Sequence, residues 1–310
     1  MNIVEMNCFN HYHSLLQCTQ MEVRDLQVFI SVARHLNYTR AGEEVHLSQP
    51  SVSVRIKQLE AELGVKLFEQ LGKKVAVTDA GLLLMPYAQR VITAVQDAEH
   101  AIQDLQGLQQ GSLRIGASTT PGMYIIPNTI ARFKERYPKI GVHLGIKDTR
   151  EIEAGVLRNE FDFGFVGGHL IGDEIDVLPW LIDELVLIVP PGHKLARKKT
   201  VNKLDLEKEQ FVLRESGSAT RATVINYLQK WGLKLQTVME MGNPESLKKA
   251  VQSGLGIAFI SKFAVESELI AKSLVTPRIT GFKIKRDLKI VYRKDKHLSR
   301  AAKTFIDMAK

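Results

Sequence analysis

The sequence has 310 residues, 45% of them hydrophobic and 25% charged, which is ordinary for a globular protein and long enough for two or three domains. No apolar run reaches the roughly 18–20 residues of a membrane span, and the first segment lacks the apolar core of a secretory signal. These observations argue against a membrane or secreted protein and predict a cytoplasmic location. The net charge of +8 indicates an anionic partner.

The leading segment, residues 1–20, is polar and contains the only two cysteines, Cys8 and Cys18. Two histidines lie between them, a spacing that would suit a metal ion, but cysteines this close to a terminus cannot hold a fold together. A disordered or extraneous tail is the favoured interpretation, because Met21 opens a sequence that looks like a natural beginning. We therefore expect no metal site and no resident cofactor.

The first domain, expected at residues 21–80, contains three predicted helices. Apolar residues recur at helical spacing over residues 26–36, and a second, short helix begins at its expected cap, Thr39. A tight turn leads to a third helix with Pro50 in its first turn, where the missing N–H is tolerated. Two helices joined by a tight turn, with a third beside them, predict a helix-turn-helix.

The third helix has one buried and one outward face. Val52, Ile56 and Leu59 are spaced by four and three residues, so they share the buried side. On the outward side, serine and glutamine groups can hydrogen-bond base edges, and Val54 can meet a thymine methyl group. A solvated helix face is the alternative. The candidate DNA-contacting residues are Arg40, Ser48, Gln49, Pro50, Ser51, Ser53, Val54, Arg55, Lys57, Lys73 and Lys74.

A basic hairpin follows this helix, which Gly64 is expected to end. Leu67–Phe68 and Val75–Val77 are predicted strands, and Gly72-Lys73-Lys74 is the tip between them, suited to the DNA backbone or minor groove. Residues 21–80 hold eight basic and eight acidic residues. The argument for DNA therefore rests on where the charges lie and not on the net charge of the domain.

A long linker helix is predicted over residues 81–110, starting near Thr78. Its apolar residues alternate spacings of four and three, as in a coiled coil through which two copies would pair. Packing of this helix against its own domain is the alternative. Pro86 is expected to bend the helix or to mark its true start. The predicted dimer seam is Leu84, Ala88, Val91, Val95, Ala98, Ile102 and Leu105.

The C-terminal domain, expected at residues 111–310, alternates strands and helices. This pattern predicts α/β layers with helices on both faces of the sheets. The predicted strands lie at 113–116, 142–146, 161–166, 185–189, 211–213, 238–241, 257–260 and 284–292, with helices at 126–137 and 299–308 among others.

Two turns that follow predicted strands are rich in hydroxyl groups, Ser118–Thr120 and Ser216–Arg221. Hydroxyls and free N–H groups at helix N-termini bind anions, although such hydroxyls often serve only as helix caps. Residues 111–310 hold 33 basic and 22 acidic residues, which suits a small anionic ligand, an acidic protein partner or a solvated lysine-rich surface. The candidate effector-binding residues are Ser118, Thr119, Thr120, Thr149, Arg214, Ser218, Thr220, Arg221 and Glu245.

The N-terminal domain resembles that of the LysR-type transcription regulators almost position by position. One departure is Gln70-Leu71, where many members have an arginine after Phe-Glu, and it removes one phosphate contact. The residues that carry the resemblance are Ala41, Leu47-Ser48-Gln49-Pro50-Ser51-Val52-Ser53, Ile56, Leu59-Glu60, Leu63-Gly64, Leu67-Phe68-Glu69 and Thr78-x-Ala80-Gly81.

The resemblance implies an α/β protein with a winged helix-turn-helix, a linker helix and a two-subdomain effector domain like a periplasmic binding protein. Subdomain I would span about 111–181 and 283–310, and subdomain II about 182–282, with the effector in the cleft between them. The chain would act as a dimer or dimer of dimers on an interrupted palindrome near a promoter. The implied partners are double-stranded DNA, a small anionic effector and RNA polymerase.

Segments around Leu213–Arg221 and Lys248–Ala258 resemble the regulators of carbon fixation and of sulfur assimilation. The peroxide-sensing branch is disfavoured, because residues 111–310 contain no cysteine. A solute-binding protein and an enzyme with a DNA-binding appendage are the rivals. The missing signal peptide and the helix-turn-helix argue against the first, and the absence of a catalytic constellation argues against the second; His169 is read as a loop residue.

Overall fold

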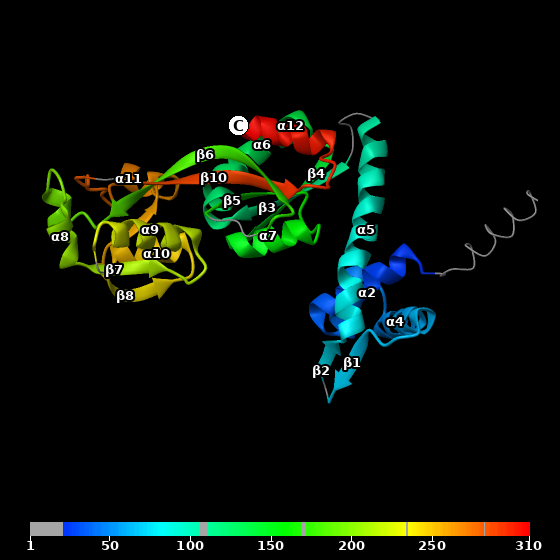
Figure 1. Ribbon diagram of the computed structural model, residues 1–310. Coiled ribbons are helices and arrows are strands. Elements are labelled where there is room, and N and C mark those ends of the chain that lie inside the picture. Colours follow the sequence, from blue (N-terminus) through cyan, green and yellow to red (C-terminus); the bar gives the residue numbers. More distant parts are fainter. Residues whose placement is uncertain (1–20, 73, 106–110, 169–171, 234, 282) are drawn as a thin grey trace, which may run out of the picture. The chain divides into compact units, whose positions relative to one another are not determined.

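The computed structural model describes residues 21–72, 74–105, 111–168, 172–233, 235–281 and 283–310 (Figure 1). They divide into two compact units, one ending at Glu99 and the other beginning at His100. No helix within these ranges is long and apolar enough to cross a membrane. The predictions for Cys8, Cys18 and His169 lie outside the described residues.

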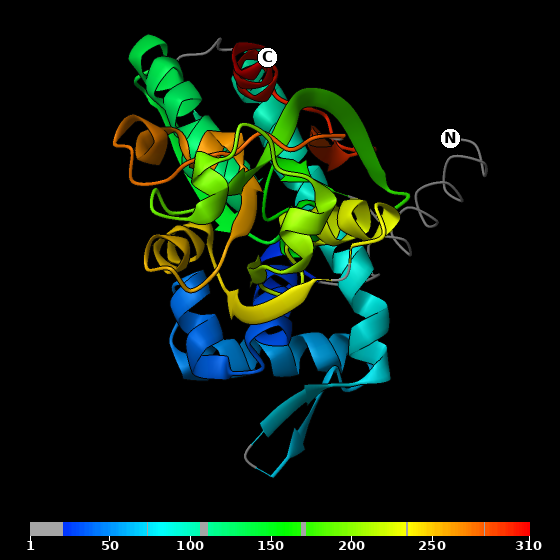
Figure 2. The same ribbon diagram turned by 90° about the vertical axis from the view of Figure 1, so that its left-hand side faces the viewer.

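The described residues of the N-terminal unit form three short helices, a hairpin and most of a long helix. The hairpin strands pair antiparallel and project away from the three short helices (Figure 2), which confirms the predicted winged helix-turn-helix. The elements are α2 (Val23–His35), α3 (Tyr38–Val45), α4 (Gln49–Leu63), β1 (Phe68–Leu71), β2 (Lys74–Val77) and α5 (Asp79–Leu105).

The starts of α3 and α5 each contradict one prediction made from the sequence. Helix α3 begins one residue early, because the side chain of Asn37 accepts hydrogen bonds from the N–H groups of Thr39 and Arg40 at 2.9 and 3.1 Å. Thr39 is therefore inside the helix and is not its cap. Pro86 lies within α5 and does not mark its start. The N-cap of α4 is Ser48, directly before the predicted helix.

The three short helices enclose one apolar core. Leu26 and Phe29 of α2 meet Val52 and Ile56 of α4, so the faces predicted from helical spacing are the faces that are buried. Ile92 of α5 also lies in this core. Packing of three helices fixes the outward direction of the opposite face of α4.

The C-terminal unit has two halves, each of alternating strands and helices. The first half begins with β3 (Gly111–Ser118), a π-helical turn η1 (Pro121–Ile125), α6 (Ile126–Arg136), β4 (Ile140–Lys147), α7 (Thr149–Leu157), β5 (Phe163–Gly167) and β6 (Ile175–Ile188). The second half contains η2 (Lys194–Arg197), α8 (Lys203–Glu207), β7 (Gln210–Arg214), α9 (Ala219–Lys230), β8 (Gln236–Met241), α10 (Pro244–Gln252), β9 (Ala258–Ser261), η3 (Lys262–Ala264) and α11 (Glu266–Ile270). The last elements are β10 (Ile284–Arg293) and α12 (Arg300–Ala309).

Two long strands, β6 and β10, run side by side through both halves (Figure 1). They are central in a six-stranded sheet of order β4-β3-β5-β10-β6-β9, in which β3 is parallel to β4 and β5, and β10 is antiparallel to β5 and β6. Strands β7 and β8 form a separate parallel pair. The connection between the halves is thus a pair of continuous strands.

Strand β6 begins ten residues before the predicted start at Leu185. The acidic pair Asp183-Glu184 looks like a break in a strand when it is read in the sequence. In the fold, Asp183 lies opposite Arg286 of β10, so the charge is paired within the sheet.

Helices cover both faces of the sheet in each half. In the first half, Phe133 of α6 and Phe305 of α12 pack on one face, and Ile152 of α7 packs on the other. In the second half, Val224 of α9 and Leu247 of α10 belong to two separate core clusters. The α/β layers predicted from the alternation are confirmed.

Candidate functional site

The turn between α3 and α4 is tight because the chain approaches itself closely at Gly42. A Cβ atom at this position would lie 2.5 Å from the carbonyl oxygen of Leu47, which leaves no room for a side chain. The N–H of Leu47 donates to the oxygen of Gly42 at 2.8 Å. This turn fixes the start of α4, where Ser48 accepts a hydrogen bond from the N–H of Ser51 at 3.3 Å.

The outward face of α4 is open to solvent. Val54 is 62% exposed, although it is apolar and lies in the middle of a helix. Most of the other predicted DNA-contacting residues of this region are exposed as well, and Ser53 is half-buried. The exposed ones are Arg40, Ser48, Gln49, Pro50, Ser51, Lys57 and Lys74, whereas Lys73 lies outside the described residues.

Arg55 does not belong to this free face. Its guanidinium pairs with the buried carboxylate of Asp25 in α2 at 2.6 Å and lies 3.6 Å from Glu22. The helix spacing placed Arg55 on the flank of α4, and the flank is where α2 packs. Arg55 therefore joins two helices of the core, and a DNA contact by its remaining exposed part stays a prediction.

The hairpin is anchored to α4 by a buried carboxylate. Glu60 accepts hydrogen bonds from the N–H groups of Leu67 and Phe68 at 2.9 and 3.2 Å, and pairs with Lys66 at 2.6 Å. Burial alone would raise the pKa of Glu60, but Lys66 and the two N–H groups hold it below its ordinary value. The charged carboxylate fixes the hairpin relative to the outward face of α4.

The apolar face of α5 is divided between two roles. Ala88 and the partly buried Leu84 pack in the core of the N-terminal unit, so these two predicted seam residues serve their own domain. The side chain of Leu105 lies outside the described part. Six exposed apolar residues of α5 lie along one stripe, namely Leu83, Tyr87, Val91, Val95, Ala98 and Ile102, while Leu82 and Ala94 are exposed as well. Leu84 and Ala88 are thus packed within their own unit, and the pairing of two copies through the rest of the predicted seam stays a prediction.

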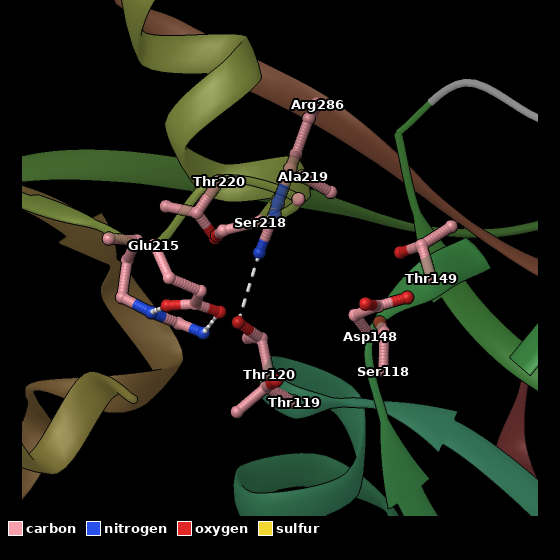
Figure 3. A pocket seen from close by; sticks show the side chains of 12 residues that line it. Ser118, Thr119, Thr120, Asp148, Thr149, Glu215, Ser218, Ala219, Thr220 and Arg286 are labelled. Carbon is pink, nitrogen blue, oxygen red and sulfur yellow. Dashed lines mark hydrogen bonds and ion pairs between the residues drawn. The ribbon is translucent and has the colours of Figure 1, made fainter. Parts of the chain in front are cut away.

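A polar pocket lies between the two halves of the C-terminal unit (Figure 3). It holds about 280 Å³ of space free of protein atoms, part of it open to solvent. The end of β3, the start of α7, the loop from β7 to α9 and the first part of β10 each contribute side chains. The lining residues are Ser118, Thr119, Thr120, Asp148, Thr149, Arg214, Glu215, Gly217, Ser218, Ala219, Thr220 and Arg286.

Seven of the nine predicted effector-binding residues line this pocket, namely Ser118, Thr119, Thr120, Thr149, Arg214, Ser218 and Thr220. The hydroxyls of Ser118 and Thr119 have no hydrogen-bond partner within the described part of the chain. Thr149 donates to the carbonyl oxygen of Gly167 at 2.9 Å, and Ser218 caps α9. The hydroxyl groups come from both halves of the unit, so a molecule in the pocket would contact both.

Arg286 is the central cation of the pocket, and the sequence did not indicate it. Its side chain points from β10 toward Thr120 (Figure 3) and donates to the hydroxyls of Thr120 and Thr220 at 3.0 and 2.9 Å. It also pairs with Asp183 at 2.7 Å, and Asp183 is fully buried. Burial lowers the pKa of Arg286, and Asp183 opposes that change. One guanidinium thus joins the first half, the second half and the connecting strands.

Arg214 is the second cation, at the end of β7. Only 5% of this residue is exposed, and its guanidinium makes two parallel hydrogen bonds with Glu215, at 2.7 and 2.6 Å. Asp148, which caps α7, places another carboxylate at the pocket wall. The pocket therefore holds two buried guanidinium groups and several hydroxyls, together with acidic groups that moderate their charge.

Two predicted effector residues lie outside the pocket. The guanidinium of Arg221 donates to the carbonyl oxygen of Arg214 at 3.0 Å and pairs with Glu240. It therefore stabilises the loop from β7 to α9 from outside the pocket. Glu245 accepts a hydrogen bond from the hydroxyl of Tyr124 at 2.6 Å and pairs with Lys248 at 2.9 Å. The structure does not bring Arg221 and Glu245 to the lining of the pocket, and their part in effector binding stays a prediction.

No group of three or more His, Cys, Asp or Glu side chains in the described ranges could hold a metal ion. The side-chain donors of the pocket are hydroxyl and guanidinium groups. Such donors bind oxyanions.

Both units match known protein families. Residues 23–82 match the family described as bacterial regulatory helix-turn-helix protein, lysR family, and residues 106–310 match the LysR substrate binding domain. A RuBisCO operon transcriptional regulator of Allochromatium vinosum is 37% identical over 285 residues, which cover 92% of this chain and 94% of that protein. The transcriptional activator CmpR of Synechocystis is 34% identical, with 92% of this chain and 93% of that protein covered.

Solved structures show the same fold. A full-length OxyR variant of Pseudomonas aeruginosa has a TM-score of 0.76 at 23% identity, covering 94% of this chain and 95% of that one. CbnR in complex with its target DNA has a TM-score of 0.64 at 22% identity, with 93% and 99% covered. The CcmR regulatory domain of Synechocystis in complex with 2-PG has a TM-score of 0.61 at 31% identity, covering 64% of this chain and 96% of that domain. This chain therefore belongs to the LysR family of DNA-binding transcription regulators, and its pocket lies in the effector-binding domain of that family.

Proposed function

We propose that the protein regulates genes of carbon fixation in response to a small oxyanion bound in the pocket between the two halves of the C-terminal unit. The observation that carries the proposal is the convergence of two buried guanidinium groups, Arg214 and Arg286, with hydroxyls from both halves. A guanidinium presents parallel N–H donors that match the oxygens of a carboxylate, phosphate or sulfur oxyanion.

The relatives support the choice of genes and of ligand. A regulator of the RuBisCO operon at 37% identity covers nearly the whole chain. The CcmR domain, at 31% identity, is a complex with 2-PG, so this compound is the first ligand to test. Sulfur assimilation is the second candidate, because sulfate would suit the same donors.

On DNA, the protein would act as a dimer or a dimer of dimers on an interrupted palindrome near a promoter, where it would act on RNA polymerase. One helix-turn-helix reads one half-site, so two copies are needed to read both. The exposed apolar stripe on α5 is the surface through which the copies would pair.

Calorimetry on the full-length protein with 2-PG, inorganic phosphate and sulfate tests the ligand. Ser118→Ala is the cleanest variant, since the hydroxyl that it removes makes no hydrogen bond within the described residues. We expect it to weaken binding roughly tenfold. Thr237→Val, on the exposed strand β8 outside the pocket, is the matched control and should bind like the wild type.

A best ligand that is neutral, or anion binding that is unchanged in both Ser118→Ala and Thr120→Val, would contradict the proposal. The target genes are tested separately. Footprinting on DNA upstream of RuBisCO-type genes should give a protected palindrome, and protection confined to unrelated promoters would refute the regulatory assignment.

A further inference from the structure

The two buried arginines of the pocket have partners of different kinds. Arg286 pairs with Asp183, which is fully buried and also accepts a hydrogen bond from Ser261 at 2.7 Å. Arg214 pairs with Glu215, whose side chain is 36% exposed. Both members of the Arg286 pair are buried, whereas the carboxylate of Glu215 already borders solvent.

The carboxylate of Glu215 binds Arg214 in the same geometry in which an oxyanion ligand would bind it. Its two oxygens accept from Nε and Nη2 of one guanidinium edge, at 2.7 and 2.6 Å. Both residues line the pocket, as do Thr119 and Thr120, and Figure 3 shows the Glu215 carboxylate paired with the guanidinium group. The same donors cannot serve Glu215 and a bidentate ligand at once.

The local backbone allows the side chain to leave without unfolding the loop. The N–H of Glu215 donates to the carbonyl oxygen of Met241 at 3.0 Å, which holds the main chain on β8. Gly217, with a φ of 110°, makes the turn into α9, and Ser218 caps that helix. Rotation of the Glu215 side chain alone would return its carboxylate to water.

We propose that Glu215 is a resident competitor for the effector, and that the carboxylate, phosphate or sulfate group of the ligand replaces its carboxylate on Arg214. A buried guanidinium without a charged partner is strongly unfavourable, so Glu215 departs only when another oxyanion takes its place. The exchange selects ligands that present two oxygens from one anionic centre. It also raises the effector concentration that is needed for binding, because the displacement of Glu215 offsets part of the binding free energy.

This inference rests on the proposed function, and calorimetry on the full-length protein separates the two. We expect Glu215→Ala to bind 2-PG or sulfate about tenfold more tightly than the wild type. Glu215→Gln, which keeps the size of the side chain, should give a gain of the same sign. Glu240→Gln is the matched control, since it removes an equal charge from a residue that pairs with Arg221 outside the pocket.

Adding Arg214→Lys to Glu215→Ala should abolish the gain in affinity, because an ammonium group cannot make the two parallel hydrogen bonds. Thermal melts establish that each variant is folded. If both folded Glu215 variants bind the anion as tightly as the wild type or more weakly, the role of Glu215 as a competitor is refuted and the proposed function is unaffected. An equal gain in Glu240→Gln would also overturn it, by showing a general charge effect. Absence of anion binding in the wild type and in both Glu215 variants would contradict the inference and the proposed effector class together.

Discussion

At the scale of single residues, one buried ion pair links stability to pH. Asp162 accepts from the nearly fully buried Lys296 at 2.9 Å and from the N–H of Arg114 at 2.7 Å. Burial alone would raise the pKa of Asp162, but these neighbours lower it below its ordinary value of 3.8. The ionised carboxylate therefore stabilises the fold above pH 3.8, and this contribution is lost as the pH falls through the lowered pKa.

Asp162→Asn should lower the free energy of unfolding of the C-terminal unit by about 3 kcal/mol at pH 7, because it removes a buried charge that pairs with the buried Lys296. Urea unfolding between pH 7 and pH 3 measures this effect. The difference in free energy of unfolding between wild type and variant should become smaller toward pH 3. The exposed Asp173→Asn is the control, and a gap that is constant across this range would refute the ion pair as its cause.

The outward residues of α4 and the hairpin should have separable roles. Val54→Ala should change the preferred base at one or two operator positions, since this exposed side chain faces away from the core. Lys74→Ala should weaken binding to all sequences alike and lower the slope of log affinity against log salt by about one. Competition binding with randomised operators at two salt concentrations distinguishes the roles. The reverse pattern would mean that the assignment of reader and backbone contact is wrong.

At the scale of elements, the π-helical turn η1 joins the two halves of the C-terminal unit. Tyr124 of η1 packs against a core cluster of the second half, donates to Glu245 at 2.6 Å and lies over Lys248, 5.4 Å from the ring centre. Tyr124→Ala should speed amide hydrogen exchange in α10 about tenfold, and Tyr124→Phe should do so less. Tyr227→Phe on α9 is the control. Equal protection in wild type and Tyr124→Ala would show that this contact does not hold the halves together.

Helix α5 offers a second test at this scale, because its buried and exposed apolar faces predict different failures. Val95→Asp puts a charge on the exposed stripe and should weaken the proposed dimer while both units stay folded. Ala88→Asp puts the charge into the core of the N-terminal unit and should unfold that unit. Sedimentation and thermal melts of the two variants separate the effects. A dimer unaltered by Val95→Asp would remove α5 from the interface.

At the scale of the whole molecule, effector and DNA must be coupled if the pocket is regulatory. A ligand shifts a two-state protein only through different affinities for its states, and the coupling is reciprocal. We expect 2-PG to change operator affinity by about five- to 100-fold, and operator DNA to change 2-PG affinity by the same factor. Operator titrations with and without 2-PG, and the converse, measure both. Unequal changes in the two affinities would exclude a simple linked equilibrium. No change in either affinity would exclude regulation through this pocket.

The sequence by itself determined the local features of this protein. Helical spacing predicted the buried faces of α2 and α4, and the hydroxyls of Ser118–Thr120 could be placed at the end of a strand because capping and strand ends depend on near neighbours in the chain. Tertiary structure alone decided the partners of the charges. Arg286 reaches Thr120 across 166 residues of chain, and Arg55 and Arg221 are held by Asp25 and Glu240. A buried ion pair and a solvated charge look alike in a sequence, because the energy that distinguishes them comes from residues that only folding brings together.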